Sequence, residues 1–112
     1  MEENLYDTSV MIDSVRRGLK ELRGCTTIFN LIEFPKAVEL EGLKVLYPTM
    51  RDCDEALKLS VRLLRLGKPI PAIDILIASM ATLRGLKLVT KDEHFKDLWS
   101  MRIGLKIEFR GK

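Results

Sequence analysis

Four acidic residues stand where short apolar segments meet the predicted starts of helices: Asp7, Glu33, Asp74 and Asp92. They are far apart in the sequence, but a fold in which strands and helices alternate would bring all four carboxylates to one edge of a sheet. Four carboxylates with no fixed cation among them repel one another, and their hard oxygen atoms favour Mg²⁺ or Mn²⁺. The sequence therefore predicts a divalent metal site formed by these four residues.

Each of these acids also has a simpler interpretation when it is taken alone. The backbone amides at a helix N-terminus stabilise a carboxylate whether or not it has a function, and Asp74 and Asp92 both fall in predicted first turns. It is the convergence of four acids that favours a metal site. The sequence contains neither a GxxxxGK loop nor a GxGxxG motif that would hold a nucleotide. A bound metal is therefore expected to act on a phosphate group that belongs to the substrate.

The elements that must position these acids follow from the apolar pattern and the capping residues. Strands are predicted at residues 4–7, 25–28, 44–47, 86–90 and 105–109. Helices are predicted at residues 10–22, 28 to about 40, 52–66, 72–84 and 95–99. The residues expected to cap or close them are Ser9 or Thr8 and Gly24 for the first helix, Thr27 for the second, Thr49 with Asp52 for the long one, Gly85 after the fourth, and residues 90–93 before the last.

Strands that alternate with helices indicate an α/β fold with a parallel sheet covered on both faces. Right-handed crossovers would then place the N-terminus of every helix near the carboxyl edge of the sheet. Asp7 and Asp92 follow strands at that edge, and Asp74 lies in the first turn of the helix that precedes the strand before Asp92. Glu33 lies about six residues into its helix, and its side chain must lean back toward the N-terminus to join the others.

Length and composition narrow the class of protein. A chain of 112 residues forms one domain, residues 1–112, and 46% hydrophobic with 31% charged residues argues against disorder. The net charge of +3 permits an acidic partner such as nucleic acid without requiring one. The longest apolar stretch, residues 75–83, is too short to span a bilayer, and no signal peptide is visible, so we expect a cytoplasmic protein with no membrane partner. Cys25 and Cys53 are expected to be reduced thiols.

Four short motifs together resemble those of the PIN-domain ribonucleases and, within them, the VapC-type toxins of toxin–antitoxin pairs. The matching segments are Asp7-Thr-Ser-Val, Thr27 to Glu33, Gly67 to Ala78, and Leu88 to Phe95. Each motif is short, but their order and spacing cover nearly the whole chain. The resemblance implies a three-layer α/β/α fold with a central parallel sheet of about five strands.

The resemblance also implies an activity, a cofactor and partners. It implies an endoribonuclease, dependent on Mg²⁺ or Mn²⁺, that cuts single-stranded or loop RNA with Asp7, Glu33, Asp74 and Asp92 as metal ligands. Ser9 and Thr90 correspond to the hydroxyl residues that support the first and fourth acids. Members of the family form homodimers and are blocked by a small antitoxin whose tail enters the active-site groove.

The chain departs from the family pattern in two places. Many relatives carry a further acid two residues before the third conserved Asp, where this chain has Ala72. The metal site would then have one ligand or outer contact fewer. The segment between Glu33 and Lys44 is also shorter than usual and contains Pro35, which affects the region that flanks the groove and helps to shape the dimer.

Basic residues are the candidates for contact with RNA. Arg16, Lys20 and Arg23 would share one face of the first helix, whereas Lys68 and Lys91 flank the acidic edge; a charged helical face is more often simply solvated. His94, the single histidine, is interpreted as an exposed first-turn residue, with a substrate contact as the alternative. The helix predicted at residues 52–66 carries more leucine than one buried face needs. The surplus suggests a homodimer or antitoxin surface, or a helix that is covered on two sides.

Two other functions compete with the nuclease. A PIN-like module could bind RNA or protein without cutting, and Ala72 is its support in the sequence. A receiver-like phosphoacceptor domain would also gather acids at the carboxyl edge of a parallel sheet, but Glu33 and Asp74 lie on helices and do not suit it. Metal-dependent turnover of RNA separates the nuclease from the binding module.

Overall fold

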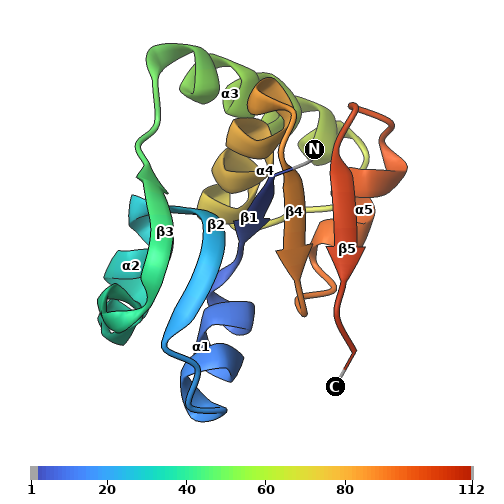
Figure 1. Cartoon of the computed structure of the whole chain (residues 1–112). Coiled ribbons are helices and arrows are strands. Elements are labelled where there is room, and N and C mark those ends of the chain that lie inside the picture. The colour runs from blue at the N-terminus through green and yellow to red at the C-terminus, as the bar shows by residue number, and fades with distance from the viewer. Residues whose placement is uncertain (1–2, 112) are drawn as a thin grey trace.

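Strands and helices alternate along residues 3–111, the part of the chain that the computed structural model describes (Figure 1). In chain order the elements are β1 (Asn4–Tyr6), α1 (Thr8–Arg16), β2 (Glu21–Thr27), α2 (Ile28–Glu33), the 3₁₀ helix η1 (Pro35–Glu39), β3 (Glu41–Leu46), α3 (Met50–Arg65), α4 (Ala72–Arg84), β4 (Lys87–Thr90), α5 (Phe95–Ser100) and β5 (Lys106–Phe109). None of the helices in these residues is long and apolar enough to cross a membrane.

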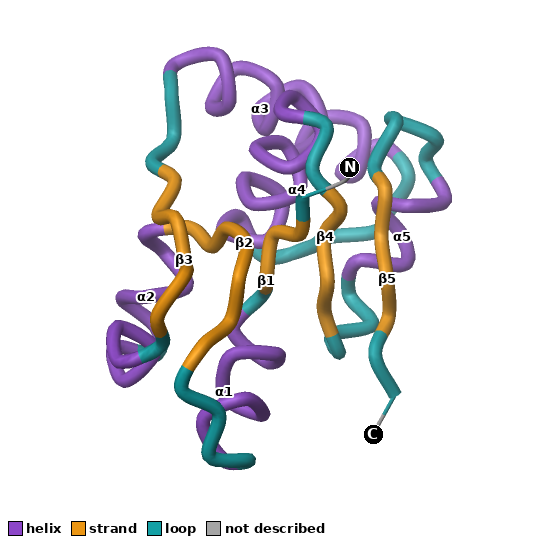
Figure 2. The backbone as a smooth tube through the Cα atoms, in the orientation of Figure 1, coloured by secondary structure: helices purple, strands orange, loops and turns teal. Residues whose placement is uncertain are grey.

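The strands of residues 3–111 form one sheet of five strands in the order β3-β2-β1-β4-β5, as they appear from left to right in Figures 1 and 2. All neighbouring pairs are parallel, and in the centre Leu5 of β1 is opposite both Cys25 of β2 and Leu88 of β4. The strand order reverses between β1 and β4. At such a reversal the connections after two neighbouring strands leave in opposite directions, which opens a crevice at their carboxyl ends.

The sheet is covered on both faces by helices. Leu5 and Leu88 lie in a core cluster with side chains from α3, α4 and α5, whereas their neighbours Tyr6 and Val89 lie in a second cluster with side chains from α1 and η1. Successive residues of a strand point to opposite faces, so each strand contributes to both clusters. The predicted three-layer α/β/α fold with a parallel sheet of five strands is confirmed. Cys25 is buried in the first cluster and Cys53 is exposed, and both are free thiols.

The first helix is shorter than predicted. It ends at Arg16 and not near Leu22, because Gly18 adopts a positive φ of 77° and Leu19 N–H donates to Ser14 O, which closes the helix. Residues 21–27 are then free to form β2. Gly24, predicted to close the helix, lies inside this strand with φ 146°, and a Cβ there would come within 2.8 Å of the Tyr6 ring. Glycine is therefore needed at position 24 for close packing between β1 and β2.

The helix caps agree with the prediction in some places and differ in others. Thr27 and Thr49 each form a capping box, and Gly85 closes α4 in the left-handed conformation. At α1, however, the residue before the first turn is Asp7, not Ser9 or Thr8, and it makes no side-chain cap. Residues 90–93 do not cap α5 either, because the residue before its first turn is His94. The side chains of Thr8, Ser9 and Thr90 instead form hydrogen bonds with residues of other segments.

The expectation that every helix begins at the carboxyl edge of the sheet is wrong for α3. This helix and α4 follow one another directly and pack antiparallel, so only one of them can begin at that edge. Asp52 in the first turn of α3 accepts two hydrogen bonds from Arg84 at the end of α4, at 2.8 and 2.9 Å. Burial by itself would raise the pKa of Asp52, but the hydrogen bonds from Arg84 and Thr49 lower it below its ordinary value.

The ion pair between Arg84 and Asp52 gives a direct test of this packing. The Asp52 side chain is only 1% exposed, so Arg84→Met leaves a buried carboxylate without its cation. We expect the free energy of unfolding to fall by about 3–5 kcal/mol, measured by urea unfolding followed by circular dichroism at neutral pH. Adding Asp52→Asn should recover part of this loss, because an amide can still accept the Thr49 N–H.

Arg65→Met, an exposed change at the end of α3, is the matched control and should alter the free energy of unfolding by less than about 0.5 kcal/mol. If Arg84→Met is as mild as this control, Asp52 is not held by Arg84 as described.

Candidate metal centre

The four acids singled out in the sequence all line one open cleft, whose volume is about 490 Å³. Asp7 directly follows β1, and Asp92 is the second residue after β4. Asp74 lies in the first turn of α4, and Glu33 is the last residue of α2. The cleft thus opens at the carboxyl ends of the two strands between which the strand order reverses.

Asp7 is the buried member of the set, only 7% exposed. Its Oδ2 accepts a hydrogen bond of 2.8 Å from Thr90 Oγ1, and its Oδ1 accepts one of 3.2 Å from Asn30 Nδ2. Burial raises the pKa of Asp7; the bonds from Thr90 and the Thr8 backbone lower it, and the charges of Asp92 and Glu33 raise it further, with a net upward shift. The folded chain therefore holds the Asp7 carboxyl group in an environment that disfavours its ionised form.

Asn30 is a site residue that the sequence analysis missed. It is 2% exposed, and its Nδ2 also donates to Thr8 Oγ1 at 2.9 Å. Its Oδ1 accepts hydrogen bonds from the backbone and the hydroxyl of Thr27. The available signal was its position three residues after Thr27, where a capping box places a polar side chain. That spacing identifies Asn30 as a capping residue, but it does not reveal that the side-chain Nδ2 of Asn30 donates to Asp7.

Thr90 connects the first and fourth acids. The same hydroxyl that donates to Asp7 accepts a hydrogen bond of 2.9 Å from Asp92 N–H, and Thr90 is fully buried. Ser9 does not contact a carboxylate directly. Its Oγ accepts a hydrogen bond of 3.0 Å from Lys91 N–H, in the loop after β4. Both hydroxyl groups thus fix the start of this loop relative to β1 and α1.

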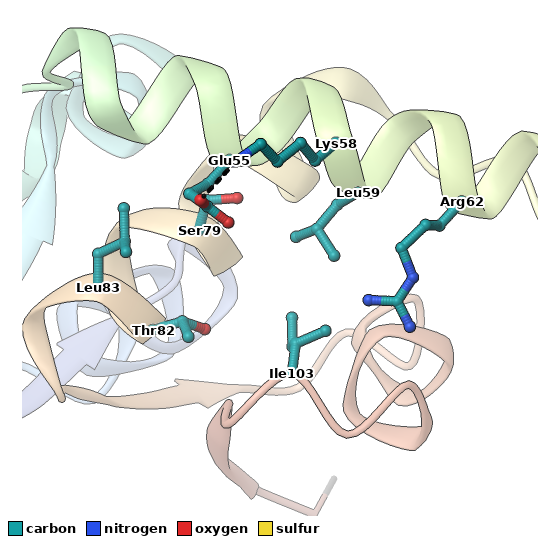
Figure 3. A pocket seen from close by; sticks show the side chains of 8 residues that line it. All are labelled: Glu55, Lys58, Leu59, Arg62, Ser79, Thr82, Leu83 and Ile103. Carbon is teal, nitrogen blue, oxygen red and sulfur yellow. Dashed lines mark hydrogen bonds and ion pairs between the residues drawn. The ribbon is translucent and has the colours of Figure 1, made fainter.

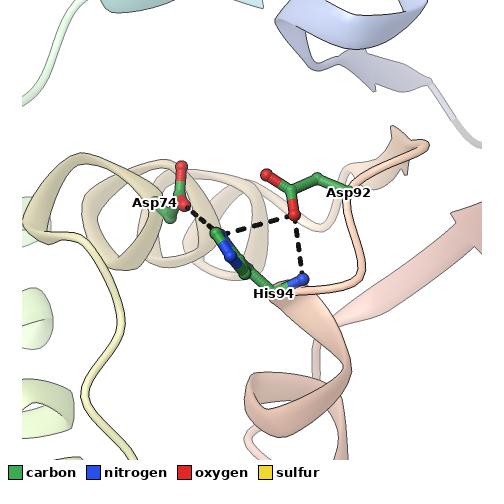
Figure 4. Close-up of side chains that lie close together, drawn as sticks. All are labelled: Asp74, Asp92 and His94. Atoms are coloured by element: carbon green, nitrogen blue, oxygen red, sulfur yellow. Dashed lines mark hydrogen bonds and ion pairs between the residues drawn. The ribbon is translucent and has the colours of Figure 1, made fainter.

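Asp74 and Asp92 face each other across His94 (Figure 4). The imidazole Nδ1 lies 3.5 Å from Asp74 Oδ2 and 3.4 Å from Asp92 Oδ1, and the three residues could share one metal ion. Burial raises the pKa of Asp74, as do the charges of Asp7 and Asp92, whereas His94 lowers it; the net shift is upward. His94 is 60% exposed, as predicted, but it precedes the first turn of α5 and does not lie in it, and its contact with both acids was not foreseen.

Glu33 lies at the rim of the cleft and is exposed. Its charge is close enough to contribute to the raised pKa of Asp7. Glu33 is the sixth residue of α2, as predicted, but the helix ends there and does not continue to about residue 40. Among the described residues that line the cleft there is no lysine or arginine. Four carboxylates, two of them with raised pKa values, therefore fit a divalent cation as the missing positive charge.

The basic residues are arranged differently from the prediction. Arg16, Lys20 and Arg23 do not share a helical face, because α1 ends at Arg16 and Arg23 lies in β2. Arg16 and Lys91 line a shallow hollow together with Ser9, which also lines the cleft.

Two of the predicted basic side chains are already paired with acids. Lys91 Nζ lies 3.3 Å from Asp13, and Lys68 Nζ lies 3.8 Å from Asp97. Of the five candidates, Arg16 and Lys91 are the two that line the hollow next to the acidic cleft.

A second groove, of about 320 Å³, lies between α3 and α4 and is closed on one side by Ile103 (Figure 3). Its floor includes Leu59, and its rim carries Lys58 and Arg62. Glu55, the one acid among its described lining residues, is paired with Lys58 at 3.4 Å. This groove therefore lacks the cluster of carboxylates that lines the acidic cleft and is not a metal site of the same kind.

Comparison with known proteins agrees with this architecture. Residues 30–98 match the model of the PIN domain family. The fold is similar to VapBC2 from Rickettsia felis bound to a promoter DNA fragment, with a TM-score of 0.77, 17% identity, and 95% of this chain and 97% of that chain covered. It is also similar to DNA-bound VapBC from Salmonella typhimurium, with a TM-score of 0.71, 24% identity, and 97% and 98% covered.

A third similar structure is VapBC-5 from Mycobacterium tuberculosis, with a TM-score of 0.74, 21% identity, and 96% of this chain and 98% of that chain covered. No match to a curated protein was found. At these identities the solved structures establish the fold, and the family model establishes the family.

The raised pKa of Asp74 predicts how the metal-free protein responds to pH. The folded chain releases this proton at a higher pH than the unfolded chain, whose ordinary value is about 3.9, so the free energy of unfolding falls as the pH rises between the two values. Asp74→Asn removes this loss. In EDTA the variant should melt at a higher temperature than the wild type near neutral pH, and the difference should shrink toward about pH 4.

Asp54→Asn, on the exposed side of α3, is the control and should show no such pH-dependent gain. Added Mn²⁺ should raise the melting temperature of the wild type more than that of Asp74→Asn. An Asp74→Asn protein that is less stable than the wild type at every pH would contradict the described repulsion.

Proposed function

Because the chain belongs to the PIN domain family, we propose that it is a divalent-metal-dependent endoribonuclease that hydrolyses phosphodiester bonds in single-stranded or loop RNA. PIN domains are generally nucleases. The observation that carries the proposal is that Asp7, Glu33, Asp74 and Asp92, from four separate segments, line a single cleft with no lysine or arginine among its described lining residues. We treat residues 1–112 as one catalytic domain, located in the cytoplasm.

The proposed role of the four acids is to hold Mg²⁺ or Mn²⁺. Such an ion, when bound, lowers the pKa of water for attack on phosphorus and neutralises the charge of the phosphate. Asp7 cannot rotate freely, because Thr90 and Asn30 hold its two oxygens, and Thr90 also fixes the backbone of Asp92. This fixed arrangement keeps the carboxylates oriented before any ion or substrate arrives.

Lys91 and Arg16 are the proposed contacts for the RNA backbone. Both line the hollow that adjoins the acidic cleft, and Lys91 is held at 3.3 Å from Asp13. Their positive charge would attract phosphates that the acids themselves repel, which places the RNA across the cleft rim. Lys68, Lys20 and Arg23 lie outside this hollow and would contribute, at most, to long-range attraction.

We further propose that the chain is the toxin of a two-protein pair and has a small antitoxin as its partner. The solved structures with the same fold are described as VapBC toxin–antitoxin complexes. A homodimer is also proposed, because α3 exposes large apolar side chains on the side away from the core. These are Leu57, Val61 and Leu64, with Leu66 directly after the helix.

One observation favours the alternative of a module that binds without cutting. Ala72 is exposed at the first position of α4, two residues before Asp74, and offers no side-chain oxygen to a metal. The structure thus has four acids at the cleft and no fifth from this position. Turnover of RNA decides between the two functions.

The central experiment incubates the purified protein with a pool of structured RNAs in Mg²⁺, Mn²⁺ or EDTA. We expect cleavage with either ion and none with EDTA. Asp7→Asn should lower the rate by about a hundredfold or more, since the loss of groups that merely support a metal ligand already costs about 10- to 100-fold. Asp54→Asn should keep the wild-type rate. Intact RNA with a folded protein that binds metal would favour the binding module.

Thr90→Val tests the positioning role of the hydroxyl, because valine has nearly the same shape. Asp7 Oδ2 loses its donor and Asp92 N–H loses its acceptor, so we expect a rate about 10- to 100-fold lower and a loss of about 1–3 kcal/mol in the free energy of unfolding. Thr82→Val is the matched control, since its hydroxyl bonds only Ala78 O within α4. Equal rates for the two variants would show that Thr90 does not position the acids.

A further inference from the structure

We propose that His94 is itself a ligand of the divalent metal, through Nδ1, and that it makes the site selective for Mn²⁺ over Mg²⁺. This inference rests on the proposed metal-dependent function and assigns a ligand and an ion preference to that site. The starting observation is that Nδ1 of His94 lies almost equally far from Asp74 Oδ2 and Asp92 Oδ1, at 3.5 and 3.4 Å.

These distances suit three atoms that share one ion. An octahedral ion with ligands at about 2.1 Å places adjacent ligand atoms about 3 Å apart. The three donor atoms all lie within 4.8 Å of one another, so a small rotation of the exposed imidazole would bring them to that spacing. Figure 4 shows the imidazole between the two carboxylates, with a dashed line from the ring to each of them.

The turn that carries His94 is fixed by the same contacts that orient Asp92. Asp92 N–H donates to Thr90 Oγ1, and His94 N–H donates to Asp92 Oδ1 at 2.9 Å. These hydrogen bonds hold the backbone of His94 close to Asp92. Its side chain is 60% exposed and lines the cleft, so the imidazole can adjust its position at little packing cost.

The other charged groups near this cluster do not offer an alternative function for the imidazole. Lys96 is paired with Glu93 at 2.9 Å, and Lys91 is paired with Asp13. As a side-chain nitrogen donor that faces two carboxylates, His94 completes a set of two oxygens and one nitrogen. Mg²⁺ prefers oxygen ligands and near-ideal octahedral geometry, whereas imidazole nitrogen binds transition metals better.

The test uses Mn²⁺ and the paramagnetic signal of the bound ion. His94 is the one histidine of the chain, so in protein freed of any affinity tag a histidine nitrogen coupled to bound Mn²⁺ can only be that of His94. We expect electron spin-echo modulation from ¹⁴N in the wild type and its loss in His94→Ala. Titration of free Mn²⁺ should show affinity reduced about tenfold by His94→Ala, the scale on which metal-site groups act. Mg²⁺ affinity, measured by competition, should change much less.

Two further variants make the result specific. His94→Asp replaces the nitrogen by oxygen and should raise the affinity for Mg²⁺ relative to Mn²⁺. Glu93→Gln changes the neighbouring charge without altering the proposed ligands, and should keep the nitrogen coupling. Bound Mn²⁺ with no nitrogen coupling, or an unchanged ratio of Mn²⁺ to Mg²⁺ affinity in His94→Ala, would overturn the role of His94 and leave the proposed nuclease intact. Failure of the wild type to bind either Mn²⁺ or Mg²⁺ would overturn both.

Discussion

The hydrogen bonds that hold the carboxylate of Asp7 connect the elements around the acidic cleft. Thr90 donates to one of its oxygens and Asn30 to the other, so β1, β4 and α2 are connected through a single side chain that is 7% exposed. A buried carboxylate is costly unless it is hydrogen-bonded. The parallel sheet reverses its strand order at this place, and the same reversal opens the cleft in which the other acids lie.

The cleft therefore holds its carboxylates in fixed positions and close enough together to repel one another. Burial and neighbouring negative charges raise the pKa values of Asp7 and Asp74, and no lysine or arginine is among the described residues that line the cleft. Elsewhere the chain pairs its buried acid fully, as with Asp52 and Arg84. The contrast indicates that the acidic edge is built for a cation that the chain does not supply, at the expense of stability in the metal-free protein.

Much of this arrangement could be predicted from the sequence, because apolar periodicity and capping residues are local signals. The α/β class, the limits of α4 and the four acids at one edge follow from such signals. What could not be predicted depends on contacts between distant segments. Gly24 is a plausible helix end in the sequence, and only the close approach of the Tyr6 ring shows that it belongs to a strand. The reach of Asn30 to Asp7 and the meeting of His94 with two acids likewise require the folded chain.

The most direct test of the account is a crystal structure of the protein with Mn²⁺, in which the anomalous signal locates the ion. We predict a peak in the acidic cleft, at about 2.0–2.3 Å from carboxylate oxygens that include those of Asp74 and Asp92, with Asp7 still held by Thr90 and Asn30. A cleft without a peak at a saturating Mn²⁺ concentration, or a peak bound only elsewhere on the surface, would contradict the claim that these acids form a metal centre.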